Sequence, residues 1–221
     1  MKSSSAYEKV YSAEAPYFPT DPLPQLLQIL RQLASPAKCL DLGCGEGRDA
    51  MVIASHGHNV TAIDFSLKAS AFLRAEAKRR RLKVSVLRSD ARKLRLPKSA
   101  YEFVYARTLL DHITYQDAVN LAKKVYFTLK PEGLLLIEVF SMRDPGNRRR
   151  YLPSSELVNW VKHYYDEGEL LGLFPKMQFL SLDRCLKYDD THGEPHFHET
   201  LILRARKSTA GWQIGRLVDY V

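Results

Sequence analysis

A glycine-rich turn with a carboxylate at its mouth is the segment of this sequence best suited to hold a ligand. Residues 41–47 read Asp-Leu-Gly-Cys-Gly-Glu-Gly, between a short apolar run and an amphipathic segment. Glycines there let the backbone approach a ligand closely. The dinucleotide fingerprint would need a glycine where Arg48 stands, and no P-loop motif occurs. The carboxylate of Asp41 would repel a pyrophosphate, so the turn favours a phosphate-free ligand with a positive end.

Acidic residues also follow the next two predicted strands. Asp64 comes directly after the apolar run 60–63, and Asp90 follows the run 84–87. Ligands of open α/β sheets bind outside the carboxyl ends of the strands, so these side chains should gather near the turn. Asp64 could accept hydrogen bonds from both ribose hydroxyls, Phe65 could pack on an adenine, and Asp90 could accept one from the adenine amino group. S-adenosylmethionine fits this set, because it joins adenosine to an ammonium and a sulfonium and has no phosphate.

Predicted strands and helices alternate along the first two thirds of the chain. Apolar runs predict strands at 39–42, 60–63, 84–87, 103–106 and 134–139, and one-sided apolar spacing predicts helices at 21–34, 47–56, 66–80 and 115–129. This alternation is typical of an α/β fold with βαβ units around a parallel sheet. A helix is then predicted at 154–165, followed by a hairpin of strands at 177–188 and 197–206. The sheet is therefore expected to end in an antiparallel edge.

The motifs resemble those of a known family. Residues 39–48, Cys-Leu-Asp-Leu-Gly-Cys-Gly-Glu-Gly-Arg, with Val-Thr-Ala-Ile-Asp at 60–64, resemble the first motif and its partner acid in class I (Rossmann-like) S-adenosylmethionine-dependent methyltransferases. Three further segments resemble the later motifs: 89–90, 101–106 and 129–136. The resemblance covers roughly residues 36–140 and is highly specific for the cofactor.

The resemblance implies a doubly wound, mostly parallel seven-stranded sheet flanked by helices, with strand order 3-2-1-4-5-7-6 and the last strand antiparallel. It implies one methyltransferase domain over 1–221, with an N-terminal arm or lid at 1–20, a cofactor-binding core at 36–140, and a substrate-side helix and hairpin at 141–206. The cofactor is expected to be S-adenosyl-L-methionine. The expected cofactor-binding residues are Asp41, Gly43, Cys44, Gly45, Gly47, Arg48, Asp64, Phe65, Asp90, Ala91, Ala106 and Arg107.

Among subfamilies, the Glu-Gly-Arg ending of the first motif and the compact length look similar to the tellurite-resistance and thiopurine-type small-molecule enzymes. The tellurite-type His-Arg before the last hairpin aligns with Lys187 and Tyr188 here. This departure argues against an oxyanion substrate.

Methyl transfer is an in-line displacement with a neutral leaving group, so a general base is needed only for a protonated nucleophile. The candidate catalytic residues are Arg107, which could clamp an anionic acceptor, and His112, which could act as a base. The alternative for Arg107 is a surface arginine, and the alternative for His112 is a residue at an ordinary helix start.

Aromatic residues at 163–165 and Phe174 could cap the substrate cleft. Tyr7 and Tyr11 could form a lid or belong to a mobile arm; the candidate substrate residues are Tyr11, Tyr164, His196 and His198.

The segment 193–199 carries two histidines and two glutamates. Strand alternation would put His196 and His198 on one face. A solvated hairpin is the preferred interpretation, and the alternatives are a face of the substrate cleft or a metal site with histidine and glutamate ligands. No metal is expected. The three cysteines include no CxxC pair, so neither a disulfide framework nor a zinc knuckle is expected.

The chain has a formal net charge of +8, with basic clusters at 78–81 and 148–150. Both clusters fall where a helix end or a loop is predicted, and cations suit a helix C-terminus. The predicted partner is a small-molecule methyl acceptor. The alternative is an RNA or protein acceptor held by the basic clusters, although residues 106–109 do not form the Asn-Pro-Pro-Tyr-like motif of base-amine enzymes. A non-catalytic cofactor-binding protein is a third hypothesis.

The sequence also carries expectations about location and assembly. It has no apolar run of about 18 residues and no signal-peptide pattern at its start. A cytoplasmic protein without a membrane partner, either a monomer or a homodimer, is expected.

Overall fold

Seven strands form one twisted sheet in the order β3-β2-β1-β4-β5-β7-β6. The computed structural model describes residues 8, 11, 21–148, 163–189 and 195–208. The strands are β1 (Lys38–Leu42), β2 (Asn59–Asp64), β3 (Val84–Arg88), β4 (Tyr101–Arg107), β5 (Leu129–Phe140), β6 (Gln178–Asp189) and β7 (His196–Arg206). The first five strands pair in parallel, and β7 is antiparallel to both β5 and β6. The predicted fold class, strand order and antiparallel edge are confirmed.

Several helices begin at a residue whose side chain caps them. They are α2 (Pro24–Gln32), α3 (Arg48–Ser55), α4 (Leu67–Arg79), α5 (Tyr115–Thr128), α6 (Pro145–Arg148) and α7 (Glu167–Gly172), with 3-10 turns η1 (Ala91–Lys93) and η2 (Leu110–His112). Ser66 caps α4 by accepting a hydrogen bond from Ala69 N, as predicted, and Thr114 caps α5 in the same way. A proline in the first turn suits the start of α2.

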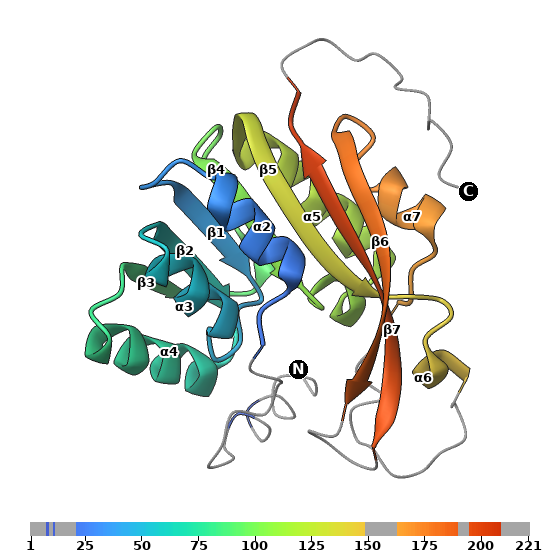
Figure 1. Cartoon of the computed structure of the whole chain (residues 1–221), viewed down its shortest axis with the longest axis horizontal. Coiled ribbons are helices and arrows are strands. Elements are labelled where there is room, and N and C mark those ends of the chain that lie inside the picture. The colour runs from blue at the N-terminus through green and yellow to red at the C-terminus, as the bar shows by residue number, and fades with distance from the viewer. Residues whose placement is uncertain (1–7, 9–10, 12–20, 149–162, 190–194, 209–221) are drawn as a thin grey trace.

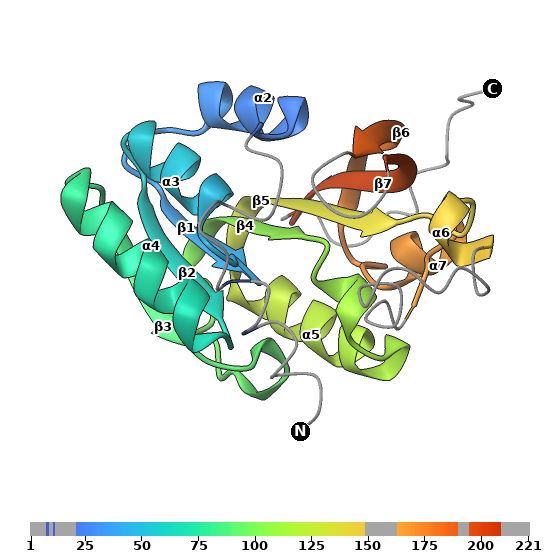
Figure 2. The same cartoon turned by 90° about the horizontal axis from the view of Figure 1, so that it is seen from below.

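Alternating strand residues build two cores, one on each face of the sheet. In β1, Cys39 packs toward α2, α3 and α4, whereas Leu40 packs toward α5. In β4, Phe103 packs on the same face as Cys39, and Val104 packs on the same face as Leu40. Figures 1 and 2 show α2 and α3 on one face of the sheet and α5 on the other. Burial on both faces explains why these strands are almost wholly apolar.

One predicted helix is wrong where the structure describes it. Residues 154–162 of the predicted helix 154–165 lie outside the described residues, and residues 163–165 are not helical. Tyr165 instead forms an isolated parallel bridge with Ser141, just after β5. Tyr165 is 0% exposed and Phe174 is 3% exposed. Both therefore belong to the core on the α5 side rather than to a cap over a cleft.

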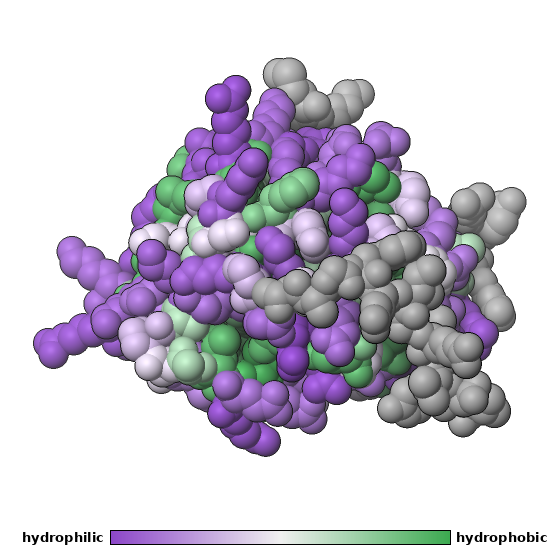
Figure 3. Space-filling view, turned by 90° about the horizontal axis from the view of Figure 1, so that it is seen from above, coloured by the Kyte–Doolittle hydropathy of each residue, from purple (hydrophilic) through white to green (hydrophobic). Residues whose placement is uncertain are grey.

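The face at the amino ends of the parallel strands is mostly hydrophilic, with apolar residues in separate small areas (Figure 3). Within the described part of the chain, the structure contains no helix with the length and apolar character needed to span a bilayer.

Candidate functional site

The glycine-rich turn between β1 and α3 has a left-handed backbone at three positions. Gly43, Gly45 and Gly47 have φ of +69°, +52° and +82°. A Cβ on Gly47 would lie 2.1 Å from Leu73 Cδ1 of α4, and a Cβ on Gly43 would lie 2.9 Å from Leu109 Cδ1. Both the backbone conformation and the close packing therefore require glycine at the mouth of the turn.

Asp64, at the carboxyl end of β2, braces this turn. Its Oδ2 accepts a hydrogen bond from Gly45 N at 2.9 Å, and its Oδ1 accepts one from Ser66 N at 2.8 Å. The side chain is 6% exposed. Because a carboxylate has about four acceptor positions, each oxygen keeps capacity for a further donor. The geometry thus brings Asp64 and the glycine turn together, as the sequence predicted.

Asp41 lies at the same edge and is 2% exposed. No described residue donates a hydrogen bond to its Oδ2. Burial raises the pKa of Asp41 well above its usual range, and the nearby carboxylate of Asp49 raises it further. A buried carboxylate with an unsatisfied oxygen is costly for the free protein, but a cationic ligand would offset that cost. This orphaned oxygen is the feature that best fits the positive end of S-adenosylmethionine.

Replacing Asp41 by asparagine is expected to weaken S-adenosylmethionine binding by about tenfold or more, which is about 1.4 kcal/mol. The free protein should be equally stable or more stable at neutral pH. The folded pKa of Asp41 is raised, so the wild type loses stability as pH climbs above the unfolded value, and asparagine avoids this loss. Titration calorimetry and urea unfolding measure the two effects. Asp183→Asn, in β6, is the control and should leave affinity unchanged. An unchanged affinity of Asp41→Asn for S-adenosylmethionine would contradict the proposal that Asp41 binds the positive end of the cofactor.

Asp90 and its neighbours lie after β3. Asp90 caps η1 through Arg92 N at 2.9 Å and is held bidentately by the Arg92 guanidinium at 2.6–3.1 Å. The hydrogen bond from Arg92 lowers the pKa of Asp90. Ala91 is 8% exposed, and Phe65 after β2 is half-buried. Asp90 is thus ionised and oriented, although Arg92 uses part of its acceptor capacity.

The described residues of the N-terminal arm, Glu8 and Tyr11, lie against the same edge. Glu8 accepts hydrogen bonds from the N–H groups of Leu67 (2.6 Å) and Lys68 (3.2 Å), at the start of α4. Burial disfavours the charged form of Glu8 and would raise its pKa, but these hydrogen bonds hold the pKa below its usual value. A Cβ on Gly45 would lie 2.9 Å from Tyr11 Oη. Tyr11 therefore lies beside the turn, and Tyr7 lies outside the described residues.

A buried charge network runs behind the turn and was not predicted from the sequence. Arg107, 14% exposed, has Nε 2.6 Å from Glu138 Oε2 and Nη1 3.6 Å from Asp49 Oδ2. Tyr105 Oη donates a hydrogen bond to Asp49 Oδ2 at 3.1 Å, and Lys187 makes a second ion pair with Glu138. The charge of Arg107 is therefore already neutralised inside the chain, and the residue serves first to compensate Glu138.

The titration of this network follows from its burial. Burial favours the neutral form of Glu138, but the cations of Arg107 and Lys187 hold its pKa below the usual value. Burial lowers the pKa of Lys187 in spite of the attraction of Glu138. Two cations thus share one carboxylate. No local sequence signal could have identified the set, because its members come from three strands and from helix α3.

Beyond the ends of β4 and β5 lies the candidate acceptor side. His112 belongs to η2 and is half-buried, whereas Asp111 beside it is 0% exposed and accepts a hydrogen bond from Phe140 N at 2.7 Å. Burial raises the pKa of Asp111 well above its usual range. The Phe140 ring lies 6.2 Å from that of Tyr164 and 4.9 Å from that of His198. The structure thus brings Tyr164 and His198 together, and Asp111 joins the candidates that the sequence missed.

Comparisons with known proteins agree with this geometry. Residues 39–133 match the model of a family described as a methyltransferase domain. A ubiquinone biosynthesis O-methyltransferase of Rickettsia akari (strain Hartford) is 29% identical over 140 residues, covering 62% of this chain and 54% of the relative. TehB of Haemophilus influenzae (strain 10810), named as a probable S-adenosyl-L-methionine-dependent methyltransferase, is 24% identical over 140 residues, covering 63% of this chain and 49% of the relative.

A solved structure of a SAM-dependent methyltransferase from Methanosarcina mazei matches with a TM-score of 0.71 at 21% identity, covering 85% of this chain and 99% of the other. The chain spans about half the length of the curated relatives it matches. The resemblance drawn from the sequence motifs is confirmed: the fold is that of class I methyltransferases, residues 39–133 match a methyltransferase domain, and a relative that matches this chain is named for its dependence on S-adenosyl-L-methionine.

Proposed function

We propose that this chain, whose residues 39–133 match a methyltransferase domain and whose fold is that of class I methyltransferases, transfers the methyl group of S-adenosyl-L-methionine to a small-molecule nucleophile. The single observation that carries the proposal is the buried, unsatisfied carboxylate oxygen of Asp41 beside a glycine turn braced by Asp64. A phosphate would be repelled there, whereas an ammonium or a sulfonium would be attracted.

The residues at the carboxyl edge have separate roles in this proposal. Asp64 would accept hydrogen bonds from the ribose hydroxyls, and Phe65 would pack on the adenine. Asp90 would accept a hydrogen bond from the adenine amino group, as the order of the strands suggests. Asp41 would face the cationic end. Gly43, Gly45 and Gly47 would let the backbone come close to the cofactor. The same edge would be lined by Cys44, Arg48, Ala91 and Ala106.

The bound cofactor supplies an activated methyl group with a neutral leaving group. The chain then has to align the acceptor and exclude water. A thiolate or a halide needs no base, whereas a phenol does. In the second case His112 is the candidate base, since it follows β4 beside the buried Asp111. The half-buried rings of Phe140, Tyr164 and His198 would suit a planar or apolar acceptor.

The basic cluster 78–81 supports a small acceptor over a nucleic acid. Arg79 and Arg80 both pair with Glu76 at the end of α4. Because α4 begins just after the carboxyl end of β2 and runs back, this cluster lies at the opposite edge of the sheet from the glycine turn. A nucleic acid bound there would be far from the methyl group.

A transfer assay tests the proposal. The protein is incubated with S-adenosylmethionine labelled in the methyl group and with thiol, halide and phenol acceptors, and separately with tRNA fragments and a protein mixture. Label in a small-molecule product, absent with Asp64→Ala, supports the proposal. Label found only in RNA, with binding that falls steeply with salt, would replace it by the nucleic-acid alternative. Cofactor binding without transfer to any acceptor would indicate a non-catalytic protein.

A further inference from the structure

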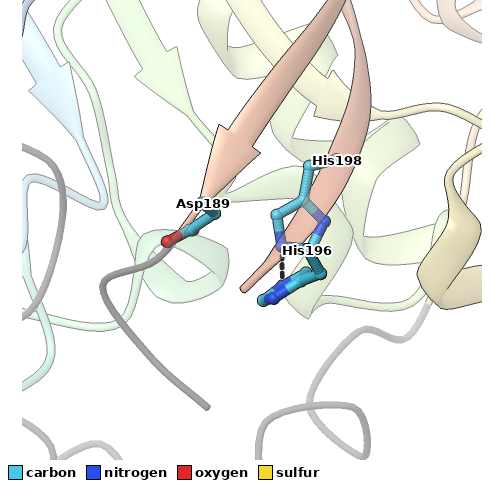
Figure 4. Close-up of side chains that lie close together, drawn as sticks. All are labelled: Asp189, His196 and His198. Carbon is cyan, nitrogen blue, oxygen red and sulfur yellow. Dashed lines mark hydrogen bonds between the residues drawn. The ribbon is translucent and has the colours of Figure 1, made fainter. Parts of the chain in front are cut away.

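Two histidines and an aspartate lie close together at the free end of the β6–β7 hairpin. Asp189 closes β6 and pairs across the hairpin with His196, the first residue of β7, and His198 follows on the same face. The Nε2 atoms of the two histidines are 2.9 Å apart, and one ligand atom from each of the three residues lies within 4.8 Å of the others. Figure 4 shows the two rings meeting edge to face beside the end of β6.

A buried carboxylate orients one of these rings. Asp144, 0% exposed, has Oδ2 3.0 Å from His198 Nδ1, and the same oxygen accepts a hydrogen bond from Glu199 N at 2.8 Å. Its other oxygen accepts from Gly146 N at 2.6 Å. Because Asp144 Oδ2 already accepts a backbone N–H, its contact with His198 is the geometry of an Nδ1–H donor, in which Nε2 is directed toward His196. Metal-binding histidines commonly have this arrangement, in which the second nitrogen donates to a carboxylate.

The spacing of the two nitrogens suits a shared ion. Imidazole nitrogens bind transition metals at about 2.0–2.1 Å, so two nitrogens 2.9 Å apart subtend about 90° at the metal, the angle between neighbouring ligands of an octahedron. A tetrahedral ion would need about 3.3 Å between them. Two ligands of one ion stand at most about 4.2 Å apart, so the Asp189 carboxylate has to rotate toward the rings to complete the set.

We propose that Asp189, His196 and His198 bind a divalent transition-metal ion, with Asp144 positioning His198. Two imidazoles and one carboxylate form a donor set that such ions favour and that leaves coordination positions open. Glu199, one of the two glutamates in the segment for which a metal site was the alternative interpretation, faces Ser141 Oγ at 2.8 Å instead, because neighbouring strand residues point to opposite faces. The site lies beyond the end of β5 on the candidate acceptor side, and its occupation does not depend on methyl transfer.

Binding of metal alone tests the proposal. Full-length protein without an affinity tag is titrated calorimetrically with Ni²⁺, Co²⁺ and Zn²⁺. One strong site per chain is expected, with loss of at least a hundredfold in affinity for the double variant His196→Gln/His198→Gln. Asp144→Asn should weaken binding about 10–100-fold while leaving all three ligands in place. His163→Gln is the matched control, since His163 also contacts a carboxylate, Glu169 Oε2 at 3.2 Å, but lies outside the cluster.

A second measurement, made on the wild type, tests the proposal even if the variants fail to fold. Substoichiometric paramagnetic Ni²⁺ is added to the wild type, and the imidazole NMR signals of its seven histidines are followed. Selective broadening of the signals of two histidines supports the site. These signals are assigned to His196 and His198 by their loss in the single variants His196→Gln and His198→Gln, or by their change in Asp144→Asn. Uniform broadening, or equal affinity in the wild type and the double variant, overturns the proposal, as does the absence of binding. In that case the two rings form only a hydrogen-bonded pair.

Discussion

Replacing Glu138 by glutamine is expected to destabilise the folded chain by about 3–5 kcal/mol, the usual cost of breaking a buried ion pair. Glu138 is 1% exposed and compensates both Arg107 and Lys187, and its Oε1 also accepts a hydrogen bond from Thr200 Oγ1 at 2.9 Å. Glutamine keeps the size of the side chain but removes the charge, so Lys187 would lose its carboxylate partner and Arg107 would keep only the more distant Asp49. Urea unfolding at neutral pH measures the loss.

The control for this experiment is Glu102→Gln. Glu102 also pairs with a lysine, Lys130, but the two side chains are 33% and 39% exposed. Exposed pairs contribute about 0–1 kcal/mol, so this variant should lose far less. Equal losses in the two variants would contradict the role assigned to burial.

The effect of Glu138 should depend on pH in a defined direction. Its pKa in the folded chain is below the usual value, so the stability it contributes is present above the unfolded pKa and is lost as pH falls through the folded one. The gap between wild type and Glu138→Gln should therefore narrow in acid. A gap that widened on acidification would show that Glu138 is not held ionised by its two cations.

Replacing Asp64 by alanine is expected to weaken S-adenosylmethionine binding by about a hundredfold or more. The proposed bonds from Asp64 to the two ribose hydroxyls involve a charged acceptor and are worth about 1.5–3 kcal/mol each, and about 1.4 kcal/mol corresponds to tenfold. The same change also removes the brace on Gly45 N and Ser66 N. Titration calorimetry with S-adenosylmethionine and its demethylated product measures the loss of affinity.

Two further variants separate binding from folding. Asp64→Asn keeps the shape and one carbonyl acceptor, and its affinity should fall between those of wild type and Asp64→Ala. Asp166→Ala removes another aspartate that accepts a backbone hydrogen bond, from Glu169 N at 2.8 Å at the start of α7, and should leave affinity unchanged. Full affinity in a folded Asp64→Ala variant would refute the ribose-binding role, and binding of NAD or ATP in place of S-adenosylmethionine would overturn the cofactor assignment.

Local chemistry made much of the fold predictable. The apolar run before the glycines became β1, Ser66 began α4, and the turn residues between 188 and 197 separated two antiparallel strands. Each of these features depends on residues close together in the chain. The predicted helix at 163–165 failed because Tyr165 is held by a partner from another part of the chain, Ser141, and local periodicity does not report such a contact.

The sequence by itself predicted the edge at which the glycine turn and Asp64 meet, because the glycines and the acids at strand ends follow one another in fixed local patterns. Only the tertiary structure decided how charges are shared. It buried Glu138 between Arg107 and Lys187, and it set Asp144 against His198, 54 residues away. The physical reason is that burial and electrostatic compensation depend on distance in space, and strands that are far apart in the chain become neighbours only when the sheet forms.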